Sequence, residues 1–453
     1  MKIIVGGAGN VGRSITSYLS RANNDIIVVD INQERLDEIA KEFDVQTVLG
    51  SVSHPDVQEK IGANTADILI SATDNDEVNL VACQVAYTLF NVPKKIARVD
   101  SEYFLSPLWN TLYNEKSLPV DLVISPAQEI AENILKIIST PGAKEVYDFA
   151  SNMLELICLQ CGDDCPLCQF QLSELYENFK DLKFTLIQIV RDGVNFYPKP
   201  NEHIKAGDEI YILSATEDVS KVLHAFNAAQ KNTENVVIFG ANAISYDIAR
   251  HLEENDNIAS IKIITNNIDE ARKLSQNLNR SVVIYGEMMS DVILGDADFK
   301  RTDTVIAITS QDKDNLLISL LAQNNGVLNT ISLVNSRMYD YLTSQISGNI
   351  IVDRSTVTIS KILQDIRYAN ISNAYSLGRG FAEVWELRLK PDTLLEGKKI
   401  ADITLPEKCK VLALVRGRQA VFNLNEATLC PDDVLIMVVS PNGIKKVESI
   451  FSV

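Results

Sequence analysis

The segment Val5–Gly12 reads V-G-G-A-G-N-V-G, and a degenerate copy of it, I-F-G-A-N-A-I-S, returns at Ile238–Ser245. The first copy follows the apolar run Ile3–Val5 and leads into the helical pattern Ser14–Leu19. A glycine-rich turn between a strand and a helix is the context that a dinucleotide-binding fingerprint requires. We therefore predict two units of one α/β fold, of which only the first keeps its fingerprint.

The glycines of the first copy have separate expected roles. Gly7 permits the tight turn, Gly9 removes a Cβ that would keep a pyrophosphate from the backbone, and Gly12 allows helix and sheet to pack closely. The helix N-terminus then offers free N–H groups to phosphate. The next apolar strand, Ile26–Val29, ends in Asp30, whose carboxylate can accept hydrogen bonds from ribose hydroxyls. The segment predicts a dinucleotide or adenine-nucleotide site, and a tight turn without a ligand is the simpler alternative.

Length and composition set the class of protein. With 453 residues, 46% apolar and 23% charged, the chain is long enough for three or four globular domains. A net charge of −18 argues against a nucleic-acid partner, because phosphate backbones need a clustered basic surface. The sequence has neither an apolar stretch long enough to cross a membrane nor a signal peptide. We expect a cytoplasmic protein whose association with a membrane is peripheral.

The first Rossmann-like unit matches a later part of the chain at nearly constant separation. V-L-G at Val48–Gly50 corresponds to I-Y-G at Ile284–Gly286, and Ile70–Leu80 corresponds to Ile306–Leu316. Each unit alternates short Ile/Val-rich runs with helical patterns, which predicts a parallel sheet covered on both faces. A duplicated domain explains these matches.

A second comparison pairs Pro141–Phe226 with Ala374–Phe451. Within these segments K-A-G-D-E-I-Y-I-L, Lys205–Leu213, aligns with L-C-P-D-D-V-L-I-M, Leu429–Met437. Strand patterns dominate, which predicts small α+β units and an alternating A-B-A-B plan.

The segments that join A to B are helical in pattern. They run from about Tyr103 to Ile138 and from Arg337 to Tyr368, with Ser125 and Ser355 as candidate helix caps. Such helices are either spacers or the hinges and dimerising arms of an assembly.

Several longer motifs resemble the TrkA family of Trk potassium uptake systems, whose members carry tandem RCK (regulator of potassium conductance) domains. The motifs are the opening M-K-I-I-V-G-G-A-G-N-V-G, S-H-P at Ser53–Pro55, A-T-D-N-D-E-V-N at Ala72–Asn79, A-C-Q-V-A-Y-T-L-F-N-V-P at Ala82–Pro93 and I-A-R at Ile96–Arg98. The resemblance covers essentially the full length. It implies two Rossmann-like, doubly wound parallel-sheet domains at 1–134 and 231–372, each followed by a small α+β RCK C-terminal domain, at 135–230 and 373–453.

The resemblance also implies a function. Members of the TrkA family are regulators without catalytic activity. They form a homo-oligomeric cytoplasmic ring at the inner face of the plasma membrane, under an integral membrane potassium transporter. Bound NAD(H), or alternatively ATP or ADP, controls the transporter. Nucleic acid is not an expected partner.

Carried over by position, the resemblance assigns the nucleotide site. The site takes backbone groups of Gly7, Ala8, Gly9, Asn10, Val11 and Gly12, the ribose acid Asp30, the strand-end residues Thr73 and Asp74, and the cation Arg98. An Arg guanidinium suits phosphate oxygens, and parallel strands deliver their C-terminal ends to the binding crevice. Asp100 lies on the same strand face as Arg98, at a position where relatives often carry another basic residue. This difference argues against a preference for triphosphates.

The second Rossmann-like unit departs from this pattern. The positions of its second and third glycines hold Asn242 and Ser245, and the position of the ribose acid holds Thr265. A Cβ at Asn242 crowds the pyrophosphate path, and a threonine is not an anionic acceptor. We expect this unit to serve as a structural partner instead of a strong nucleotide site.

Four cysteines lie within the segment C-L-Q-C-G-D-D-C-P-L-C: Cys158, Cys161, Cys165 and Cys168. In a cytosolic protein such clustering indicates a metal before a disulfide. However, only three residues separate the two C-x-x-C pairs, whereas structural zinc sites join separated knuckles. Two interpretations of the cluster therefore remain open. The cysteines form a metal or redox sensor, or they are buried side chains that pack as small apolar residues. An NAD-dependent oxidoreductase is a further alternative, although the B units offer no His/Asp pair and no obvious nucleophile.

Overall fold

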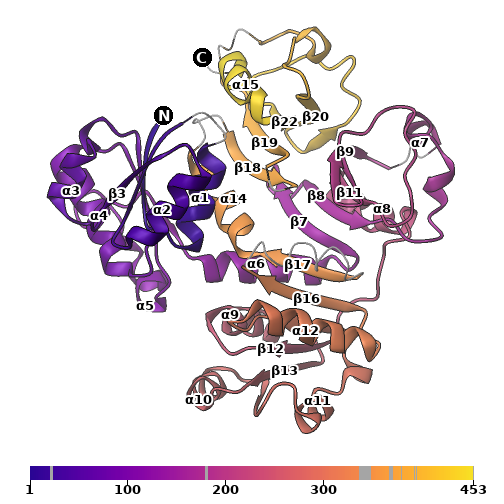
Figure 1. Ribbon diagram of the computed structural model, residues 1–453. Helices are drawn as coiled ribbons and strands as arrows, with labels where there is room; N and C mark the ends of the chain where they lie inside the picture. The colour runs from indigo at the N-terminus through magenta and orange to yellow at the C-terminus, as the bar shows by residue number, and fades with distance from the viewer. Residues whose placement is uncertain are drawn as a thin grey trace. The chain divides into compact units, whose positions relative to one another are not determined.

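The computed structural model describes residues 1–20, 24–178, 182–335, 348–366, 371–378, 380–391, 393 and 395–451. Four sheets follow one another along the chain, two with six strands and two with five (Figure 1). The chain divides into two compact units, the first of Met1–Glu129 with Arg354–Ile366 and the second of Ile130–Asp353 with Arg367–Val453.

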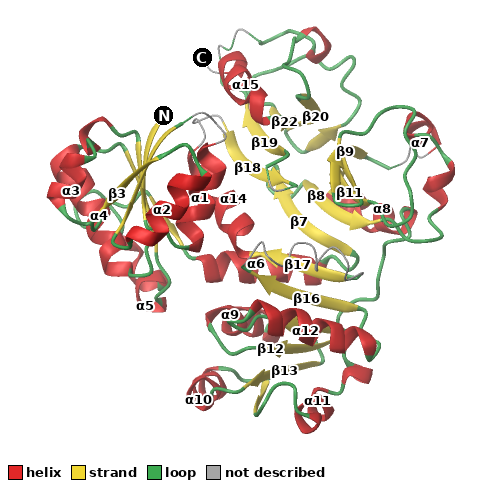
Figure 2. Cartoon of the chain, viewed as in Figure 1, coloured by secondary structure: helices red, strands yellow, loops and turns green. Residues whose placement is uncertain are grey.

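The first unit contains a six-stranded parallel sheet in the order β3-β2-β1-β4-β5-β6. Its strands are β1 (Lys2–Gly6), β2 (Asp25–Asp30), β3 (Gln46–Leu49), β4 (Ile68–Ser71), β5 (Lys94–Arg98) and β6 (Leu122–Ile124). The central strand β4 is buried along its whole length, because helices cover both faces of the sheet (Figure 2). This is the doubly wound order of dinucleotide-binding folds, as predicted.

Side-chain caps mark the starts of two helices of this sheet, α2 and α4. The main helices are α1 (Asn10–Ser20), α2 (Gln33–Glu42), α3 (Pro55–Lys60) and α4 (Asp76–Phe90), with the short α5 (Glu102–Leu105), η1 (Ala63–Thr65) and η2 (Pro107–Leu112). Asn32 accepts hydrogen bonds from the amides of Glu34 and Arg35, and Asn75 accepts one from the amide of Val78. These caps place α2 and α4 directly after the strand ends that line the crevice.

The last helix of the first unit comes from much later in the chain. Helix α14 (Arg354–Ile366) packs along α1 and against β6 (Figure 1). Ser14 Oγ donates to Ser355 Oγ at 2.9 Å, and Lys361 pairs with Glu129 at 3.4 Å. Helix α6 (Pro126–Ser139) belongs to the second unit from Ile130 onward. The boundaries 1–134, 135–230, 231–372 and 373–453 remain our proposal for the four domains, with α14 contributed to the first sheet.

The prediction that the segments joining A to B are helical is partly wrong. Each contains a short strand, β6 in the first and β17 (Asn349–Asp353) in the second, that extends a parallel sheet by one edge strand. Strands as short as the three residues of β6 and the five of β17 carry too little periodicity to be separated from a neighbouring helical pattern. Ser125 accepts a hydrogen bond from the Gln128 amide at 3.5 Å and caps α6, as predicted. Ser355 lies inside α14 and is not its cap; residues 336–347 and 367–370 of the second segment lie outside the described residues.

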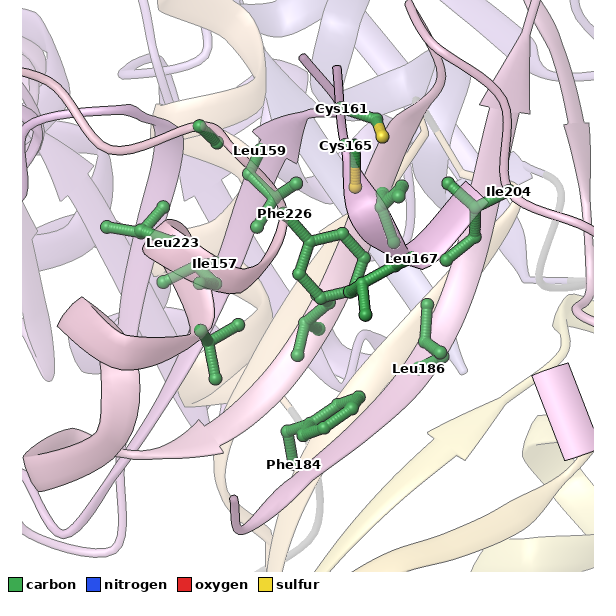
Figure 3. Packing of buried hydrophobic residues seen from close by; sticks show 14 of the residues in the cluster. Ile157, Leu159, Cys161, Cys165, Leu167, Phe184, Leu186, Ile204, Leu223 and Phe226 are labelled. Atoms are coloured by element: carbon green, nitrogen blue, oxygen red, sulfur yellow. The ribbon is translucent and has the colours of Figure 1, made fainter. Parts of the chain in front are cut away.

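The second unit begins with a five-stranded antiparallel sheet in the order β10-β9-β11-β8-β7. Its elements are β7 (Ala143–Phe149), β8 (Leu154–Gln160), η3 (Pro166–Gln169), α7 (Leu172–Asn178), β9 (Phe184–Arg191), β10 (Val194–Phe196), β11 (Glu209–Ala215), η4 (Thr216–Asp218) and α8 (Val219–Ala225). One face buries a core around Phe184 and Phe226, whose rings meet edge to face (Figure 3). The other face, with Leu156, packs against Val384 of the last sheet.

A second six-stranded parallel sheet repeats the order of the first, β14-β13-β12-β15-β16-β17. Its elements are β12 (Asn235–Phe239), α9 (Ala243–Glu253), β13 (Ser260–Thr265), α10 (Ile268–Asn277), β14 (Val282–Tyr285), α11 (Asp291–Ala297), η5 (Phe299–Arg301), β15 (Thr304–Ala307), α12 (Asp312–Asn324), β16 (Asn329–Val334) and β17. The identical strand order confirms the predicted duplication.

The last sheet is antiparallel, in the order β18-β19-β22-β20-β21. Its elements are β18 (Ile371–Leu377), β19 (Ala382–Arg388), η7 (Ile400–Asp402), β20 (Lys410–Arg416), β21 (Gln419–Val421), β22 (Val434–Val439), η8 (Pro441–Gly443) and α15 (Ile444–Phe451). The predicted fold class, two doubly wound domains each followed by a small α+β domain, is confirmed.

Each small sheet has an equivalent buried Arg–Asp ion pair, and the two pairs correct our alignment of the small domains. Arg191 pairs with Asp208 at 2.8 Å, and Arg416 pairs with Asp433 at 2.8 Å. Both aspartates are 1% exposed in their side chains. The sequence alignment had matched Asp208 to Asp432, one residue away, because D-D offers two equivalent choices. Only the buried partner of the arginine distinguishes them.

Candidate nucleotide site

Two of the three fingerprint glycines are required by the fold itself. Gly7 has φ +102°, and a Cβ there would lie 2.8 Å from the carbonyl oxygen of Ala72. A Cβ at Gly12 would lie 1.8 Å from the carbonyl oxygen of Gly7. The turn and the close packing of α1 on the sheet therefore exclude any side chain at either position, which is the role the sequence predicted for them.

Gly9 is different, because the protein does not fill the space beside it. The nearest atom to an added Cβ is a guanidinium nitrogen of Arg35, 3.9 Å away. Among the described residues, no group accepts a hydrogen bond from the backbone amides of Gly9, Asn10 and Val11. These amides lie at the N-terminus of the 11-residue helix α1, where the dipole favours an anion. The open space and the free donors fit a phosphate group.

Asp30 holds the glycine loop in place. The residue is 8% exposed and stands at the end of β2. Oδ2 accepts a hydrogen bond from the Ala8 amide at 2.5 Å, and Oδ1 accepts one from the Asn32 amide at 2.8 Å. Each carboxylate oxygen can accept a second bond, so a ribose hydroxyl can still be bound. The sequence predicted the ribose contact but not this role in shaping the loop.

Asn79 organises the opposite side of the crevice, and sequence reasoning missed it. Its Oδ1 accepts hydrogen bonds from the amide and the hydroxyl of Thr73, at 3.0 and 2.7 Å. Its Nδ2 donates to the carbonyls of Thr73 and Arg98, at 3.1 and 2.9 Å. Asn79 is fully buried and ties the end of β4 to the end of β5. The signal was a polar residue on the buried face of α4. Asp74, by contrast, is exposed at the rim.

The expected cation, Arg98, is already engaged by a carboxylate. Its guanidinium forms an ion pair with Asp100, while its buried Nε has no partner among the described residues. The amide of Asp100 donates to Asp76 at 3.0 Å. Asp100 lies beyond the end of β5, and Arg98 is 19% exposed. A phosphate that binds Arg98 must therefore compete with Asp100 for it.

The second Rossmann-like unit uses its own side chains where the first leaves donors free. The side chain of Asn242 accepts from the Ser245 amide at 3.1 Å and donates to the Ile308 carbonyl at 2.7 Å. Ser245 Oγ accepts from the Asn242 amide at 2.8 Å, which completes a capping box. Thr265 is buried and accepts from the Asn267 amide at 3.1 Å. This closed loop supports the prediction that the second unit is a structural partner.

Comparison with known proteins identifies the family. The TrkA-N domain model matches residues 3–126 and 236–353, and the TrkA-C domain model matches residues 384–452. The chain is 32% identical to the Trk system potassium uptake protein TrkA of Azorhizobium caulinodans, over 100% of this chain and 99% of that protein. The chain belongs to the TrkA family. The TrkA of Halomonas elongata is 33% identical, again over 100% of this chain and 99% of that protein.

Solved structures share the fold of this TrkA-family chain at low identity. The GsuK channel bound to NAD aligns with a TM-score of 0.61 and 16% identity, over 100% of this chain and 79% of that one. The GsuK RCK domain aligns with a TM-score of 0.61 and 17% identity, over 100% and 95%. The likeness extends over both Rossmann-like domains and both small domains. Among the described residues of the TrkA-family chain, no helix has the length and apolar character needed to cross a membrane.

The structure separates the four clustered cysteines of this TrkA-family chain. Cys158 lies on β8 and faces the core that contains Leu156 and Val384, and burial raises the pKa of its thiol. Cys161 and Cys165 belong to the core on the opposite face, beside Cys168. Successive strand positions alternate between faces, which explains why Cys158 leaves the predicted group. Only the three later cysteines remain together.

Proposed function

We propose that this chain is the nucleotide-sensing regulatory subunit of a Trk-type potassium uptake system, controlling transport without catalysing a reaction. One observation carries the proposal: the first Rossmann-like domain keeps free amides and open space at Gly9, whereas the second closes the same loop with Asn242 and Ser245. Membership of the TrkA family supports the link to potassium uptake. The first sheet has the strand order of dinucleotide-binding folds, which is consistent with one ligand site in each chain.

The proposed ligand is NAD(H), with ATP or ADP as the competing candidates. Asp30 suits the unmodified ribose of NAD(H), because a carboxylate at this position accepts from both ribose hydroxyls. The GsuK structures, which share the fold, include one bound to NAD and one bound to ADP. The pairing of Arg98 with Asp100 reduces the positive charge available to a triphosphate, which favours the dinucleotide.

In the proposed complex the phosphates bind the amides of Gly9, Asn10 and Val11 at the N-terminus of α1. A phosphate oxygen that reaches Arg98 displaces Asp100, whose backbone is tied to Asp76 at the start of α4. The bound and free states then differ at the segment that follows β5. A ligand can regulate only through such a difference in affinity between two states.

The proposal places the chain in the cytoplasm, peripheral to the inner face of the plasma membrane. Its partners are an integral membrane Trk-type potassium transporter subunit and further copies of itself. Light scattering of the purified chain should show a dimer or larger ring, and a stable monomer with and without nucleotide would contradict the assembly.

Calorimetric titration with NAD, NADH, ATP and ADP tests the ligand. Wild type should bind one equivalent of its ligand per chain. Asp30→Ala should weaken binding by roughly 100-fold or more, since it removes both the ribose acceptor and the partner of the Ala8 amide. Thr265→Ala changes the equivalent position of the second domain and serves as the matched control, with unchanged affinity. Failure of all four nucleotides to bind wild type would remove the proposed input signal.

A further inference from the structure

Three thiols converge in the loop that follows β8. Cys161 is the first residue after the strand, Cys165 directly precedes η3, and Cys168 lies within it. The three Sγ atoms all lie within 4.8 Å of one another, and those of Cys161 and Cys168 are 3.6 Å apart. The spacing C-x-x-x-C-x-x-C thus brings three soft ligands together from one short segment.

We propose that Cys161, Cys165 and Cys168 bind a single thiophilic metal ion, Zn²⁺ or Cu⁺, through three thiolates. With metal–sulfur bonds of about 2.3 Å, two thiolates on one tetrahedral ion lie about 3.8 Å apart. The observed sulfur separations of 3.6 Å and at most 4.8 Å suit that arrangement. A polynuclear iron–sulfur cluster holds its thiolates on separate metal atoms and needs wider spacing. Binding forms three metal–sulfur bonds and releases the thiol protons to solvent.

The backbone fixes the loop before any ion binds. The Cys161 amide donates to the Asp208 carbonyl at 2.8 Å, and the Gly162 amide donates to the Phe226 carbonyl at 3.2 Å. The Cys165 amide donates to the Gly162 carbonyl, and the Cys168 amide to the Cys165 carbonyl, each at 3.2 Å. A Cβ at Gly162 would lie 2.4 Å from the Asn227 carbonyl oxygen, so this close approach needs a glycine. Little reorganisation is required to gather the thiolates.

The second small domain shows that the fold does not need a cysteine here. Leu389 takes the place of Cys161: its amide donates to the Asp433 carbonyl at 2.9 Å, and its carbonyl accepts from the Asp432 amide at 3.0 Å. In the first small domain the Cys161 carbonyl accepts from the Gly207 amide at 2.9 Å. Cys161 and Leu389 are each 2% exposed. An ordinary apolar side chain fills the equivalent position of the second small domain, so the fold itself does not require a thiol at position 161.

The proposed site is closed on its inner side and open on its outer side. Cys161 and Cys165 belong to the core that contains Leu167 and Phe226 (Figure 3). Cys168 is only half-buried. No other Cys, His, Asp or Glu of the described chain adds a ligand atom to the group. Three protein ligands leave a coordination position for solvent or an exchanging thiol, whereas structural zinc sites use four. The site is therefore suited to reversible occupancy.

Metal titration under reducing, chelator-treated conditions tests the proposal. The probes are Zn²⁺ in competition with a chromophoric chelator, Co²⁺ as a spectroscopic substitute, and Cu⁺ without oxygen. Wild type should bind one ion per chain, with thiolate-to-metal charge-transfer absorption for Co²⁺. Cys168→Ser should weaken affinity by more than about 100-fold, since it removes a direct ligand. Cys430→Ala removes a thiol from the second small domain and should change nothing. The Zn²⁺ and Cu⁺ affinities decide which ion the site prefers.

A further variant separates binding from folding. Cys161→Leu copies the side chain of Leu389, so it should melt close to wild type and bind no ion at this site. The proposal is overturned if wild type binds neither Zn²⁺ nor Cu⁺ stoichiometrically, or if Cys168→Ser and Cys161→Leu bind as wild type does. Nucleotide titration of the same variants is expected to be unchanged, which keeps this test independent of the proposed function.

Discussion

Gly9→Ala should weaken nucleotide binding by roughly 100-fold or more and leave the fold intact, whereas Gly12→Ala should damage the fold. The two glycines belong to one fingerprint, yet their surroundings differ. An alanine Cβ at position 9 meets nothing closer than 3.9 Å, and one at position 12 meets the Gly7 carbonyl oxygen at 1.8 Å. The space beside Gly9 is therefore kept for a ligand, and the space beside Gly12 is occupied by the protein.

The expected stability changes have opposite signs. Gly9 does not adopt a left-handed backbone, so alanine causes no strain there and can stabilise the chain by about 0.4–1 kcal/mol through the unfolded state. Gly12→Ala forces α1 away from the loop, and such overpacking costs about 1–3 kcal/mol or more. The melting temperature should rise slightly or stay constant for Gly9→Ala and fall for Gly12→Ala.

Of the glycine variants that keep the fold, only Gly9→Ala should weaken nucleotide binding. The Cβ prevents close approach of phosphate to the amides of Gly9, Asn10 and Val11. Loss of two charge-assisted hydrogen bonds, at about 1.5–3 kcal/mol each, corresponds to at least a 100-fold weaker affinity. Thermal unfolding and calorimetric titration measure both quantities on the same samples.

Gly295→Ala is the matched control, because a Cβ there meets nothing within 4 Å and the position is in α11, remote from the loop in sequence. It should bind nucleotide as wild type does. The reasoning is refuted if folded Gly9→Ala keeps wild-type affinity, or if it melts as early as Gly12→Ala.

Three further predictions concern single side chains. Asn79→Ala should lower the free energy of unfolding by about 3 kcal/mol, because it leaves buried carbonyl and amide groups at two strand ends unpaired. Chemical denaturation measures this change, and a loss below about 1 kcal/mol would contradict the prediction. Asp100→Ala frees Arg98 and should tighten nucleotide binding by up to about tenfold in calorimetry, with no gain if Arg98 is outside the site. Burial raises the pKa of Glu145 from 4.5 to about 7. The folded state therefore holds this proton more tightly than the unfolded state, and stability should fall by up to about 3 kcal/mol as pH rises from about 4.5 to 7. Glu145→Gln should flatten that pH profile, and an equally steep profile in the variant would exclude this cause.

Much of the fold could be read from the sequence because its signals are local. Strands such as Ile26–Val29 appear as short apolar runs between helical patterns, and β2 (Asp25–Asp30) contains this run. The edge strand Leu122–Ile124 escaped prediction because only pairing with β5 defines it. The match of Asp208 to Asp432 was one residue out because the choice between Asp432 and Asp433 depends on a buried arginine.

The candidate site divides in the same way. Residue type and spacing pointed to Gly7, Gly9, Gly12 and Asp30, because a phosphate-binding turn constrains each position of a continuous segment. Nothing in the sequence pattern indicates that Asp30 holds the Ala8 amide or that Asp100 engages Arg98. Those contacts depend on side-chain directions at strand ends, which the sheet fixes only after folding.

The sequence by itself determined the duplicated plan, the intact first fingerprint and the degenerate second one, because these rest on residue type, periodicity and repetition along the chain. Only the tertiary structure decided which glycine is free for a ligand, which cysteines meet, and that α14 covers the first sheet. The physical reason is that these features depend on distances between atoms far apart in sequence, and such distances exist only once the sheets and helices have packed.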